Sequence, residues 1–521
     1  MPDNPINGGS TMKPGRMWLF IAIWLLIKTD FLPANPLLDP GFGNDVKPQQ
    51  GEQEPPFDMG ILLKAADQGT AEAQLALAAM YFLGKGVPQD YTEAAKWLRK
   101  AADQGLAEAQ CNLGLMYQDG KGVPQDFAEA VKWYRKAADQ GFEKAQVSLG
   151  YIYQAGTDVP QDIAEAANWF RKAAGQGDPD AQILLAGMYV AGNGVPQDYG
   201  EALKWFREAA DQGDTDAQIG LAEMYAAGKG VPQNYVEALK WFREAANQGN
   251  AEAQCALGFI YQDGKGVPQN YAEAVKWFRE AADQGYAEAQ VTLAFMYHDG
   301  KGVSRDLAES ARWYHRAADQ GSIQAQYDLA VMYKNGQGVN QDQAEAVKWF
   351  RKAADSDLVQ AQSDLAEMYA GGKGVPQDYA EAAKWIRKAA DQGDAHAQYN
   401  LGIIYFSGTG VQQDNNEGAK WLRKAAEHGD NQAIIDLAAR YSEGMGTPQD
   451  YVQAYMWLLL SADSPRKAAV ERLNKLNKLA KNMTPQQLTE AQRLAREWES
   501  ELWKTFHSIR RDQKPKELPK N

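Results

Sequence analysis

The sequence predicts an all-α fold, a solenoid of 36-residue helical hairpins, and two observations lead to it. From Ala65 to Leu460 one phrase is written eleven times, each copy starting 36 residues after the one before. A unit of this length cannot bury its own apolar residues, so neighbouring copies must stack. Each copy also contains two stretches with the apolar spacing of a helix, separated by glycine and proline.

The first helix of each unit, helix A, is predicted in the first copy from Ala71 to about Leu83. Its apolar stripe consists of Ala73, Leu77, Met80 and Tyr81. Because these residues recur at helical spacing, they lie on one face. The helix is expected to end at Gly84, Gly86 and Pro88, since glycine permits positive φ and proline cannot continue a helix.

The second helix, helix B, is predicted from Asp90 to about Gln104. Asp90 is expected to cap the N-terminus while Glu93 reaches back to the cap residue, a capping box that all eleven copies keep in equivalent form. Gly105 follows as the left-handed residue that ends the helix. The basic residues of the second half, where the helix dipole favours cations, are Lys96, Arg99 and Lys100.

Three positions are nearly invariant among the copies and predict the packing core. The position of Tyr81 is tyrosine in all eleven copies, ending at Tyr441, and that of Trp97 is tryptophan in all eleven, ending at Trp457. The position of Ala78 holds only alanine or glycine, where a larger side chain would hold two helices apart. Aromatic residues at helical spacing are typical of packing, and each can bury roughly 150–250 Å².

The fixed residues of each copy read AEAQ–LG–MY–G–GVPQDY–EA–KW–RKAA, as in Ala107 to Ala138. This phrase resembles the Sel1-like repeat, a relative of the tetratricopeptide repeat, over about three quarters of the chain. The resemblance implies an all-α right-handed superhelix that serves as an interaction scaffold, in bacteria often in the cell envelope or in signalling. The few departures concern local rigidity and not the fold, and they are Asp357 and Asp158 at glycine positions and Ser304, Asn340 and Gln412 at the loop proline.

Residues 1–34 are predicted to be an N-terminal signal peptide or membrane anchor. Lys13 and Arg16 precede Met17–Ile27, an apolar run with the length of a signal-peptide core but too short to span a bilayer comfortably. Cleavage after Ala34 and retention as an uncleaved anchor both stay open. Residues 35–56, rich in Pro, Gly, Gln and acidic residues, are predicted to be a flexible linker.

The solenoid is predicted to cover residues 57–460, as an N-terminal half-unit and eleven repeats. In the last copy, Met456, Leu459 and Leu460 replace polar helix-B residues, so a following segment is expected to pack there. We therefore predict C-terminal capping helices over residues 461–503, with Thr484 as an N-cap before Pro485. A basic tail is predicted over residues 504–521.

The charge distribution argues against a nucleic-acid partner. The net charge is −14, and residues 464–521 hold 14 Lys and Arg against 7 Asp and Glu, so the residues before them carry −21. Nucleic-acid phosphates demand a cationic surface, which the solenoid does not offer. The basic C-terminal end is interpreted as a solvated tail, with contact to anionic lipid or an acidic partner as the alternative.

The sequence carries no recognisable catalytic, metal or cofactor site. Its five histidines form no HExxH pair and no Cys/His cluster, no GxSxG elbow occurs, and the GKG loops lack the Lys-Ser/Thr of a P-loop. Some Sel1-type relatives have been labelled β-lactamase-like, but no Ser-x-x-Lys occurs here with its companion motifs. The two cysteines, Cys111 and Cys255, stand four repeats apart and cannot form an intrachain disulfide. We therefore predict no enzyme activity and no cofactor.

The variable positions of helix A are predicted to face a concave groove that binds a protein or peptide. They correspond in the first copy to Glu72, Leu75, Ala76, Ala79, Phe82 and Leu83. Read across the copies, they carry a set of aromatic residues, which are the candidate partner-binding residues: Tyr151, Phe259, Phe295, Tyr327 and Tyr399. Such residues are typical of protein-binding grooves, although packing against adjacent helices explains them equally well.

The function expected from these observations is an exported bacterial scaffold or adaptor that holds partner proteins or peptides. It is expected in the periplasm or secreted, with possible association with the inner membrane through the N-terminal apolar segment. The alternatives are a cytosolic signalling adaptor, a secreted factor that acts on a host cell and, less favoured, a β-lactamase-like enzyme or cell-wall hydrolase. The sequence does not identify the partner.

Overall fold

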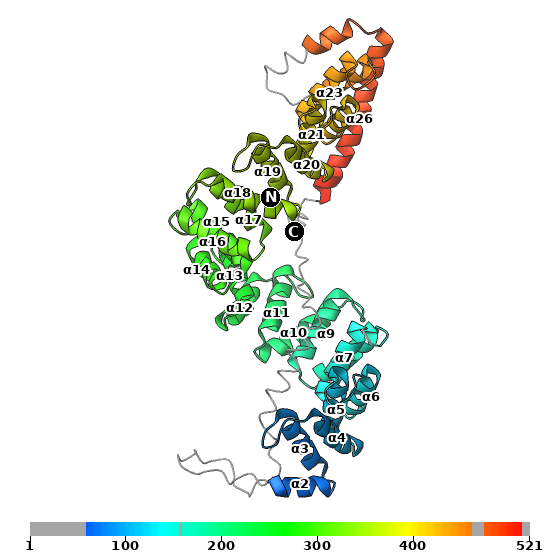
Figure 1. Ribbon diagram of the computed structural model, residues 1–521, viewed down its shortest axis with the longest axis vertical. Helices are drawn as coiled ribbons and strands as arrows, with labels where there is room; N and C mark the ends of the chain where they lie inside the picture. Colours follow the sequence, from blue (N-terminus) through cyan, green and yellow to red (C-terminus); the bar gives the residue numbers. More distant parts are fainter. Residues whose placement is uncertain (1–58, 157–158, 461–473, 513–521) are drawn as a thin grey trace. The chain divides into compact units, whose positions relative to one another are not determined.

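The computed structural model describes residues 59–156, 159–460 and 474–512. Every regular element in these ranges is a helix (Figure 1). The signal peptide or anchor over 1–34 and the linker over 35–56 lie outside the described residues, as does Asp158. None of the described helices is long and apolar enough to cross a membrane.

The repeats form eleven helical hairpins, which confirms the predicted solenoid of 36-residue units. The A helices are α3 (Ala71–Leu83), α5 (Ala107–Asp119), α7 (Glu143–Ala155), α9 (Pro179–Ala191), α11 (Thr215–Ala227), α13 (Ala251–Asp263), α15 (Ala287–Asp299), α17 (Ile323–Asn335), α19 (Val359–Gly371), α21 (Ala395–Ser407) and α23 (Asn431–Glu443). The B helices are α4 (Tyr91–Asp103), α6 (Phe127–Asp139), α8 (Ile163–Ala174), α10 (Tyr199–Asp211), α12 (Tyr235–Asn247), α14 (Tyr271–Asp283), α16 (Leu307–Asp319), α18 (Gln343–Asp355), α20 (Tyr379–Asp391), α22 (Asn415–Glu427) and α24 (Tyr451–Leu460).

The hairpins belong to two compact units. The N-terminal unit ends at Ile260 and includes residues 265–268, and the C-terminal unit contains residues 261–264 and the chain from Gln269 onward. Within the N-terminal unit, α4 packs on α5, α6 on α7, α8 on α9 and α10 on α11. The C-terminal unit repeats this arrangement from α14 on α15 to α22 on α23. In each unit, therefore, the hairpins pack in series.

The start of each B helix is capped by an acidic or amide side chain, but the predicted capping box is wrong in its second half. The Asp126 carboxylate accepts from the Glu129 backbone N–H at 3.0 Å, as expected of an N-cap. The Asp126 backbone N–H, however, donates to the Tyr117 carbonyl at 2.9 Å, near the end of helix A. Glu129 does not reach back and pairs with Lys132 at 2.6 Å. The same N–H to tyrosine carbonyl bond closes all eleven hairpins.

A glutamine side chain in the loop between the two helices also stabilises this loop, which was not predicted from the sequence. The Gln125 side-chain amide donates to the Gln118 carbonyl at 2.8 Å and so satisfies a free carbonyl at the end of helix A. Gly120 adopts φ +68° as the left-handed residue after helix A. The loops at Ser304, Asn340 and Gln412 keep the same closing bonds, so the missing proline does not change the connection.

The second loop glycine is required by close contact between neighbouring repeats. Gly122 adopts φ +71°, and a Cβ there would lie 2.0 Å from the Tyr91 carbonyl oxygen at the start of the preceding B helix. Gly338 has the same relation to the Leu307 carbonyl, also at 2.0 Å. Any side chain at these positions would push adjacent hairpins apart.

The aromatic and small residues have the packing roles predicted for them. Trp241 and Trp457 are only 8% and 2% exposed, and the tryptophan position is buried or half-buried in every hairpin. A Cβ at Gly114 would lie 3.0 Å from the Tyr134 ring and 3.2 Å from the Ala130 carbonyl, which explains the small residue where helix A crosses helix B. The tyrosines of helix A are mostly half-buried, and hydroxyl groups such as that of Tyr189 contact the preceding repeat.

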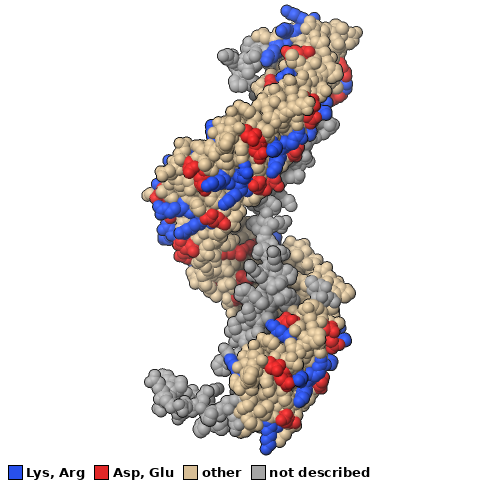
Figure 2. All heavy atoms as spheres, viewed as in Figure 1, with Lys and Arg blue, Asp and Glu red and all other residues tan. Residues whose placement is uncertain are grey.

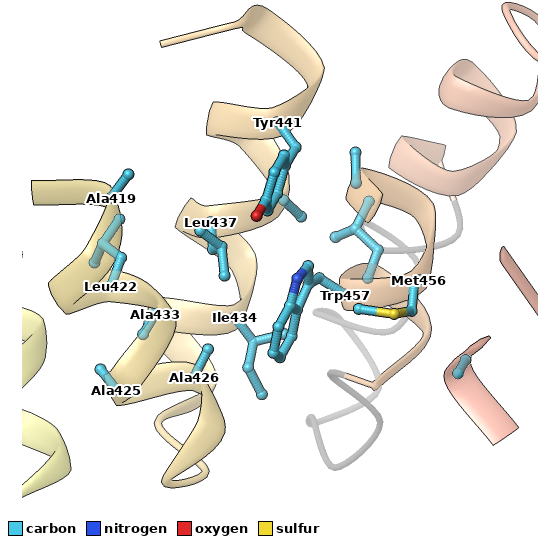
Figure 3. Close-up of a cluster of buried hydrophobic side chains, with 14 of the residues drawn as sticks. Ala419, Leu422, Ala425, Ala426, Ala433, Ile434, Leu437, Tyr441, Met456 and Trp457 are labelled. Atoms are coloured by element: carbon cyan, nitrogen blue, oxygen red, sulfur yellow. The ribbon is translucent and has the colours of Figure 1, made fainter. Parts of the chain in front are cut away.

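Both ends of the array are covered. At the N-terminal end, α2 (Met59–Asp67) packs on α3, with Leu62 and Ala66 in one cluster with Leu77. At the C-terminal end, Trp457 and Ile434 lie together in the last repeat (Figure 3). The same cluster includes Leu459 and Leu460 of α24, and it continues into the chain that follows the last repeat through buried Leu476 and Ala495 and the partly buried residues Leu479, Leu494 and Trp498.

The last helix, α26 (Pro485–Asp512), packs along α24. Thr484 caps it as predicted, because its hydroxyl accepts from the Gln487 backbone N–H at 3.2 Å. The Gln487 side chain accepts in return from the Thr484 N–H at 2.8 Å, so a complete capping box exists here. The helix continues to Asp512, into the segment predicted as a basic tail.

Candidate functional site

Neighbouring repeats are joined by arginine–tyrosine pairs. The Arg171 guanidinium in α8 donates from Nη2 to the Tyr189 hydroxyl in α9 at 3.1 Å, and its Cζ lies 6.0 Å from the centroid of that ring. From the sequence, these arginines were predicted to interact with the helix dipole, and their pairing with tyrosine was not predicted. The same donation occurs between seven other pairs, namely Arg99–Tyr117, Arg135–Tyr153, Arg207–Tyr225, Arg279–Tyr297, Arg351–Tyr369, Arg387–Tyr405 and Arg423–Tyr441.

A second set of contacts is a ladder of buried glutamines. Gln110 in α5 is 5% exposed and donates to the Ala102 carbonyl of the preceding hairpin at 3.0 Å. Its Oε1 accepts from Gln140 at the end of α6, at 2.7 Å. A rung such as this one connects two hairpins through side-chain amides whose polar atoms are hydrogen-bonded. The fixed residues of the repeat, glutamine, arginine, tyrosine and tryptophan, are therefore occupied in holding the array together.

The surface that remains free to differ between repeats is the variable face of helix A, formed by the positions of Glu72, Leu75, Ala76, Ala79, Phe82 and Leu83. All five candidate residues lie on it. Phe295 in α15 is 37% exposed and has the Lys301 ammonium 4.7 Å from its ring centroid. Phe259 in α13 is half-buried. Tyr151 in α7 is half-buried and packs edge-on against Phe170, with ring centroids 5.4 Å apart.

Tyr327 and Tyr399 connect consecutive A helices in the C-terminal unit. The Tyr327 hydroxyl donates to Asp364 at 3.0 Å, and the Tyr399 hydroxyl donates to Asp436 at the same distance. Burial, followed by the nearby Asp364 carboxylate, raises the pKa of Tyr327 to about 12. Tyr399 behaves in the same way beside Asp436, with its pKa also raised to about 12. Both tyrosines are half-buried, so one ring face packs while the rest stays on the variable face.

Charged groups surround Tyr327. Lys334 in α17 lies 2.8 Å from Asp364 and 3.4 Å from Glu367 in α19. Lys373 approaches the other oxygen of Glu367 at 3.3 Å. Although burial opposes the charge, the Asp364 and Glu367 carboxylates raise the pKa of Lys334 above its ordinary value, so the lysine stays charged. The variable face in α17 and α19 is therefore an aromatic patch with a fixed set of paired charges.

The exposed charges are interspersed. Figure 2 shows Lys and Arg side chains with Asp and Glu side chains beside them on the face that it displays. Many are neighbours on one helix, such as Lys96 with Glu93 at 2.6 Å and Lys276 with Glu273 at 2.8 Å. Such exposed pairs contribute little stability each. The phosphate backbone of a nucleic acid requires a continuous cationic track, which these mixed charges do not make.

In the described part of the chain, the titratable residues form no recognisable reaction centre. Among the described residues, no group of three or more His, Cys, Asp or Glu side chains is placed to hold a metal ion. His298 and His315 each contact one aspartate on their own helix, and His428 contacts Gln398 at 2.9 Å in the glutamine ladder. Cys111 and Cys255 are both buried and neither is in a disulfide, and burial raises the pKa of Cys111 to about 12, which leaves it unreactive.

Comparison with known families and structures agrees with this architecture. The Sel1 repeat model matches eleven consecutive segments, residues 71–106, 107–142, 143–178, 179–214, 215–250, 251–286, 287–322, 323–358, 359–394, 395–430 and 431–464. The comparison with curated proteins gives no match.

Two solved structures resemble the chain at useful identity. A protective antigen of uropathogenic Escherichia coli with an SLR fold is 35% identical, with a TM-score of 0.57, over 89% of this chain and 98% of that one. A Sel1 repeat protein from Oxalobacter formigenes is 38% identical, with a TM-score of 0.54, over 59% of this chain and 90% of that one. With eleven matched repeats in unbroken phase and the hairpin architecture that they encode, the chain belongs to the Sel1 repeat family.

Proposed function

We propose that this protein is an exported bacterial scaffold that holds partner proteins or peptides on the variable face of its A helices. The proposal rests on the observation that constant and variable residues of the repeat have different roles. The residues common to all repeats are consumed by contacts within the array, whereas the aromatic residues of the variable face differ from repeat to repeat. A surface that varies on a constant frame is typical of repeat proteins that bind other proteins.

Phe295 is the strongest anchor candidate on this face. It is among the few large apolar side chains that remain exposed in the described part of the chain. The nearby Lys301 gives the ring a charged neighbour, so an apolar contact would have a polar rim. Tyr327 and Tyr399 add amphipathic rings whose hydroxyl groups are held by Asp364 and Asp436, which fixes the rings at low entropy cost.

Export to the periplasm or outside the cell is part of the proposal. It is motivated by the apolar run Met17–Ile27 behind two basic residues, which lies outside the described part of the chain. The similar Escherichia coli protein is described as a protective antigen, which favours a surface-exposed or secreted scaffold over a cytosolic adaptor. A role in contact with a host cell is the narrower form of the same proposal. Fractionation of the native cell tests both against the cytosolic alternative.

We assign no catalytic activity and no cofactor to the scaffold. The β-lactamase-like and cell-wall hydrolase alternatives are tested with the purified chain on a chromogenic β-lactam and on peptidoglycan. Turnover of either substrate would overturn the assignment. The proposal also involves no nucleic-acid partner, and a salt-dependent retardation of DNA or RNA by the chain would contradict it.

The binding proposal is tested by capture of partners from the native cell with matched variants. Phe295→Ala removes the exposed ring from helix A, and Tyr379→Ala removes a ring of 44% exposure from helix B. We expect Phe295→Ala to weaken capture of a specific partner about thirtyfold, the effect of losing an anchor of about 2 kcal/mol. Tyr379→Ala should leave capture unchanged. Equal losses in both variants, or a loss accompanied by unfolding of Phe295→Ala, would contradict the assignment of the face.

A further inference from the structure

The series of arginine–tyrosine pairs is interrupted once inside the C-terminal unit. At the position held by arginine in the pairs described above, α16 carries His315, and the tyrosine that follows in α17 is Tyr333. The histidine side chain is shorter than that of arginine, so its imidazole cannot replace the guanidinium that contacts the tyrosine in the regular repeats. Its Nδ1 lies 2.9 Å from Asp319 on its own helix, and its ring lies edge-on to Trp349 with centroids 5.4 Å apart.

Tyr333 is left without the donor that its equivalents have. Arg351, one repeat further along, donates to the Tyr369 hydroxyl, whereas no described residue forms a hydrogen bond with the hydroxyl of Tyr333. Beside it lies a cavity of about 390 Å³ between α16 and α17. Its lining includes Ala311, His315, Leu329, Tyr333 and Val339. The cavity is thus located where the guanidinium group would be in a regular repeat.

One of the two aromatic rings that surround a regular arginine also lines the cavity. In the regular repeat of α20, Arg387 lies 5.5 Å from the Tyr405 ring centroid and 5.8 Å from the Trp421 ring centroid. The equivalents of these rings are Tyr333, which lines the cavity, and Trp349, which is buried and packs edge-on against His315. A planar cation stacks well on aromatic faces and donates hydrogen bonds in its plane, so the cavity retains what guanidinium recognition needs.

Two arginines beside the cavity, Arg312 and Arg316, do not exclude a further cation. Arg312 pairs with Glu309 at 2.9 Å, and the Arg316 guanidinium lies over the Trp313 ring, 4.5 Å from its centroid. The same two positions are cationic around regular arginines, where Lys384 and Lys388 flank Arg387. A guanidinium is therefore accommodated between two cations elsewhere in this chain.

Two nearby carboxylates act on the Tyr333 hydroxyl. Burial raises the pKa of Tyr333 above its ordinary value, and the carboxylates of Glu345 and Asp342 raise it further. These acidic groups make the Tyr333 oxygen a better acceptor for a charged donor.

We propose that the cavity between α16 and α17 binds the guanidinium group of an arginine side chain supplied by another polypeptide. The guanidinium would donate to the Tyr333 hydroxyl and lie against the Tyr333 ring. This site lies between a B helix and the next A helix, away from the variable face, so it goes beyond the scaffold function proposed above. Its test uses a defined peptide, and its outcome does not depend on partners of the variable face.

The experiment measures peptide binding to the full chain by ligand-observed saturation-transfer NMR. The probes are the pentapeptide acetyl-Gly-Gly-Arg-Gly-Gly-amide and the same peptide with lysine or glutamate at its centre. His315→Arg fills the cavity with the chain's own guanidinium, and it should fold because arginine is the residue of the regular repeats. Tyr333→Phe removes the acceptor, and Tyr369→Phe is its matched control in a repeat where Arg351 occupies the place.

We expect the arginine peptide to bind at least about tenfold more tightly than the lysine peptide, and His315→Arg to weaken it by about the same factor. Tyr333→Phe should weaken it about fivefold and Tyr369→Phe should have no effect. Equal binding of the arginine and lysine peptides, preference for the glutamate peptide, or absence of binding would each overturn the proposal. So would arginine-peptide binding that His315→Arg leaves intact, because the peptide would then lie elsewhere.

Discussion

The Gln140 side chain donates to Gln110 Oε1 at 2.7 Å. This bond connects the end of α6 to a buried residue of α5, the A helix of the same hairpin. Gln110 passes the connection on to the Ala102 carbonyl of the preceding hairpin at 3.0 Å. Buried amides that are fully hydrogen-bonded specify a unique register between helices, whereas a half-satisfied amide destabilises. The stability of this solenoid therefore depends on which of these buried amides have all their hydrogen bonds and which do not.

Ser356→Gln should stabilise the C-terminal unit. Ser356 stands where other repeats have the glutamine that donates to the ladder, and the buried Oε1 of Gln326 has no partner among the described residues. The new amide should satisfy this oxygen and raise the free energy of unfolding by about 0.5–1.5 kcal/mol, measured by urea denaturation. Ser356→Met, of similar length but without a donor, should bring no such gain. Equal gains from both changes would attribute the effect to packing alone.

Asp357→Gly should also stabilise the chain. Asp357 has φ +62°, the only non-glycine residue with positive φ in the described ranges, at a position where other repeats use glycine. A left-handed conformation costs an L-residue about 1–2 kcal/mol, and aspartate less, so we expect a gain of about 0.5–1 kcal/mol. The change also removes a long contact from Gln362 to the Asp357 carboxylate at 3.4 Å. Asp357→Ala should destabilise instead, and the order Gly, Asp, Ala in urea midpoint tests the argument.

Asp178→Asn should change how stability depends on pH. Burial, and then the neighbouring Glu143 carboxyl group, raises the pKa of Asp178 to about 6. Because the folded chain binds this proton more tightly than the unfolded chain, the free energy of unfolding falls as pH rises from about 4 through 6. At neutral pH, ionised Asp178 therefore lowers the free energy of unfolding by on the order of 1–2 kcal/mol, a figure that allows for solvent screening at this half-buried site.

Asparagine keeps the cap without the charge, as Asn250 does at the equivalent position, where it accepts from Ala253 N–H at 3.0 Å. We therefore expect Asp178→Asn to stabilise at pH 7 and to flatten the profile between pH 4 and 6. Glu143→Gln should give a smaller change of the same sign. A variant that loses stability equally at pH 4 and pH 7 would show that the carboxylate acts mainly as a cap.

Trp498→Ala should loosen the last repeat first. The Trp498 ring lies 5.2 Å from that of Trp457, centroid to centroid, and both belong to the cluster that covers Met456. Loss of this half-buried ring should cost about 1–3 kcal/mol and reduce hydrogen-exchange protection in residues 431–460, with repeats far from the end unaffected. Arg496→Ala, an exposed change on the same helix, is the control. A uniform loss of protection over the C-terminal unit would contradict coupling between neighbours.

The period and the composition of the repeat were sufficient to predict the fold. An unbroken 36-residue spacing requires identical hairpins, and Asp90, Gly84 and Trp97 have local roles that depend only on residues nearby in the chain. The bond from the Asp90 N–H to the Tyr81 carbonyl was missed because it depends on how tightly the loop turns back, which no residue pattern specifies. Thr484, by contrast, starts a helix after an open connection, and there it caps the helix as predicted, within a capping box that was not predicted.

The contacts between repeats were harder to predict than the repeats themselves. Arg171 and Tyr189 are 18 residues apart and lie in adjacent hairpins, so their pairing depends on the rotation of one hairpin against the next. Gln140 and Gln110 are 30 residues apart within one hairpin, so their pairing depends on how its two helices pack. The signal was present as near-invariance of the two positions, but near-invariance alone does not separate a residue of the core from one that connects repeats. Tyr327 illustrates the same limit, because the groove and packing interpretations of its ring both match its half-buried position.

The most direct test of the scaffold proposal places a photo-crosslinking amino acid, benzoylphenylalanine, at position 295 and separately at position 379. Phe295 and Tyr379 are similarly exposed aromatic residues, 37% and 44%, on an A helix and a B helix of the C-terminal unit. Each variant is expressed in the native cell, irradiated, and its adducts are identified by mass spectrometry. The proposal predicts a defined protein adduct from position 295 and none from position 379, whereas adducts from position 379 alone, or identical adducts from both, would contradict it.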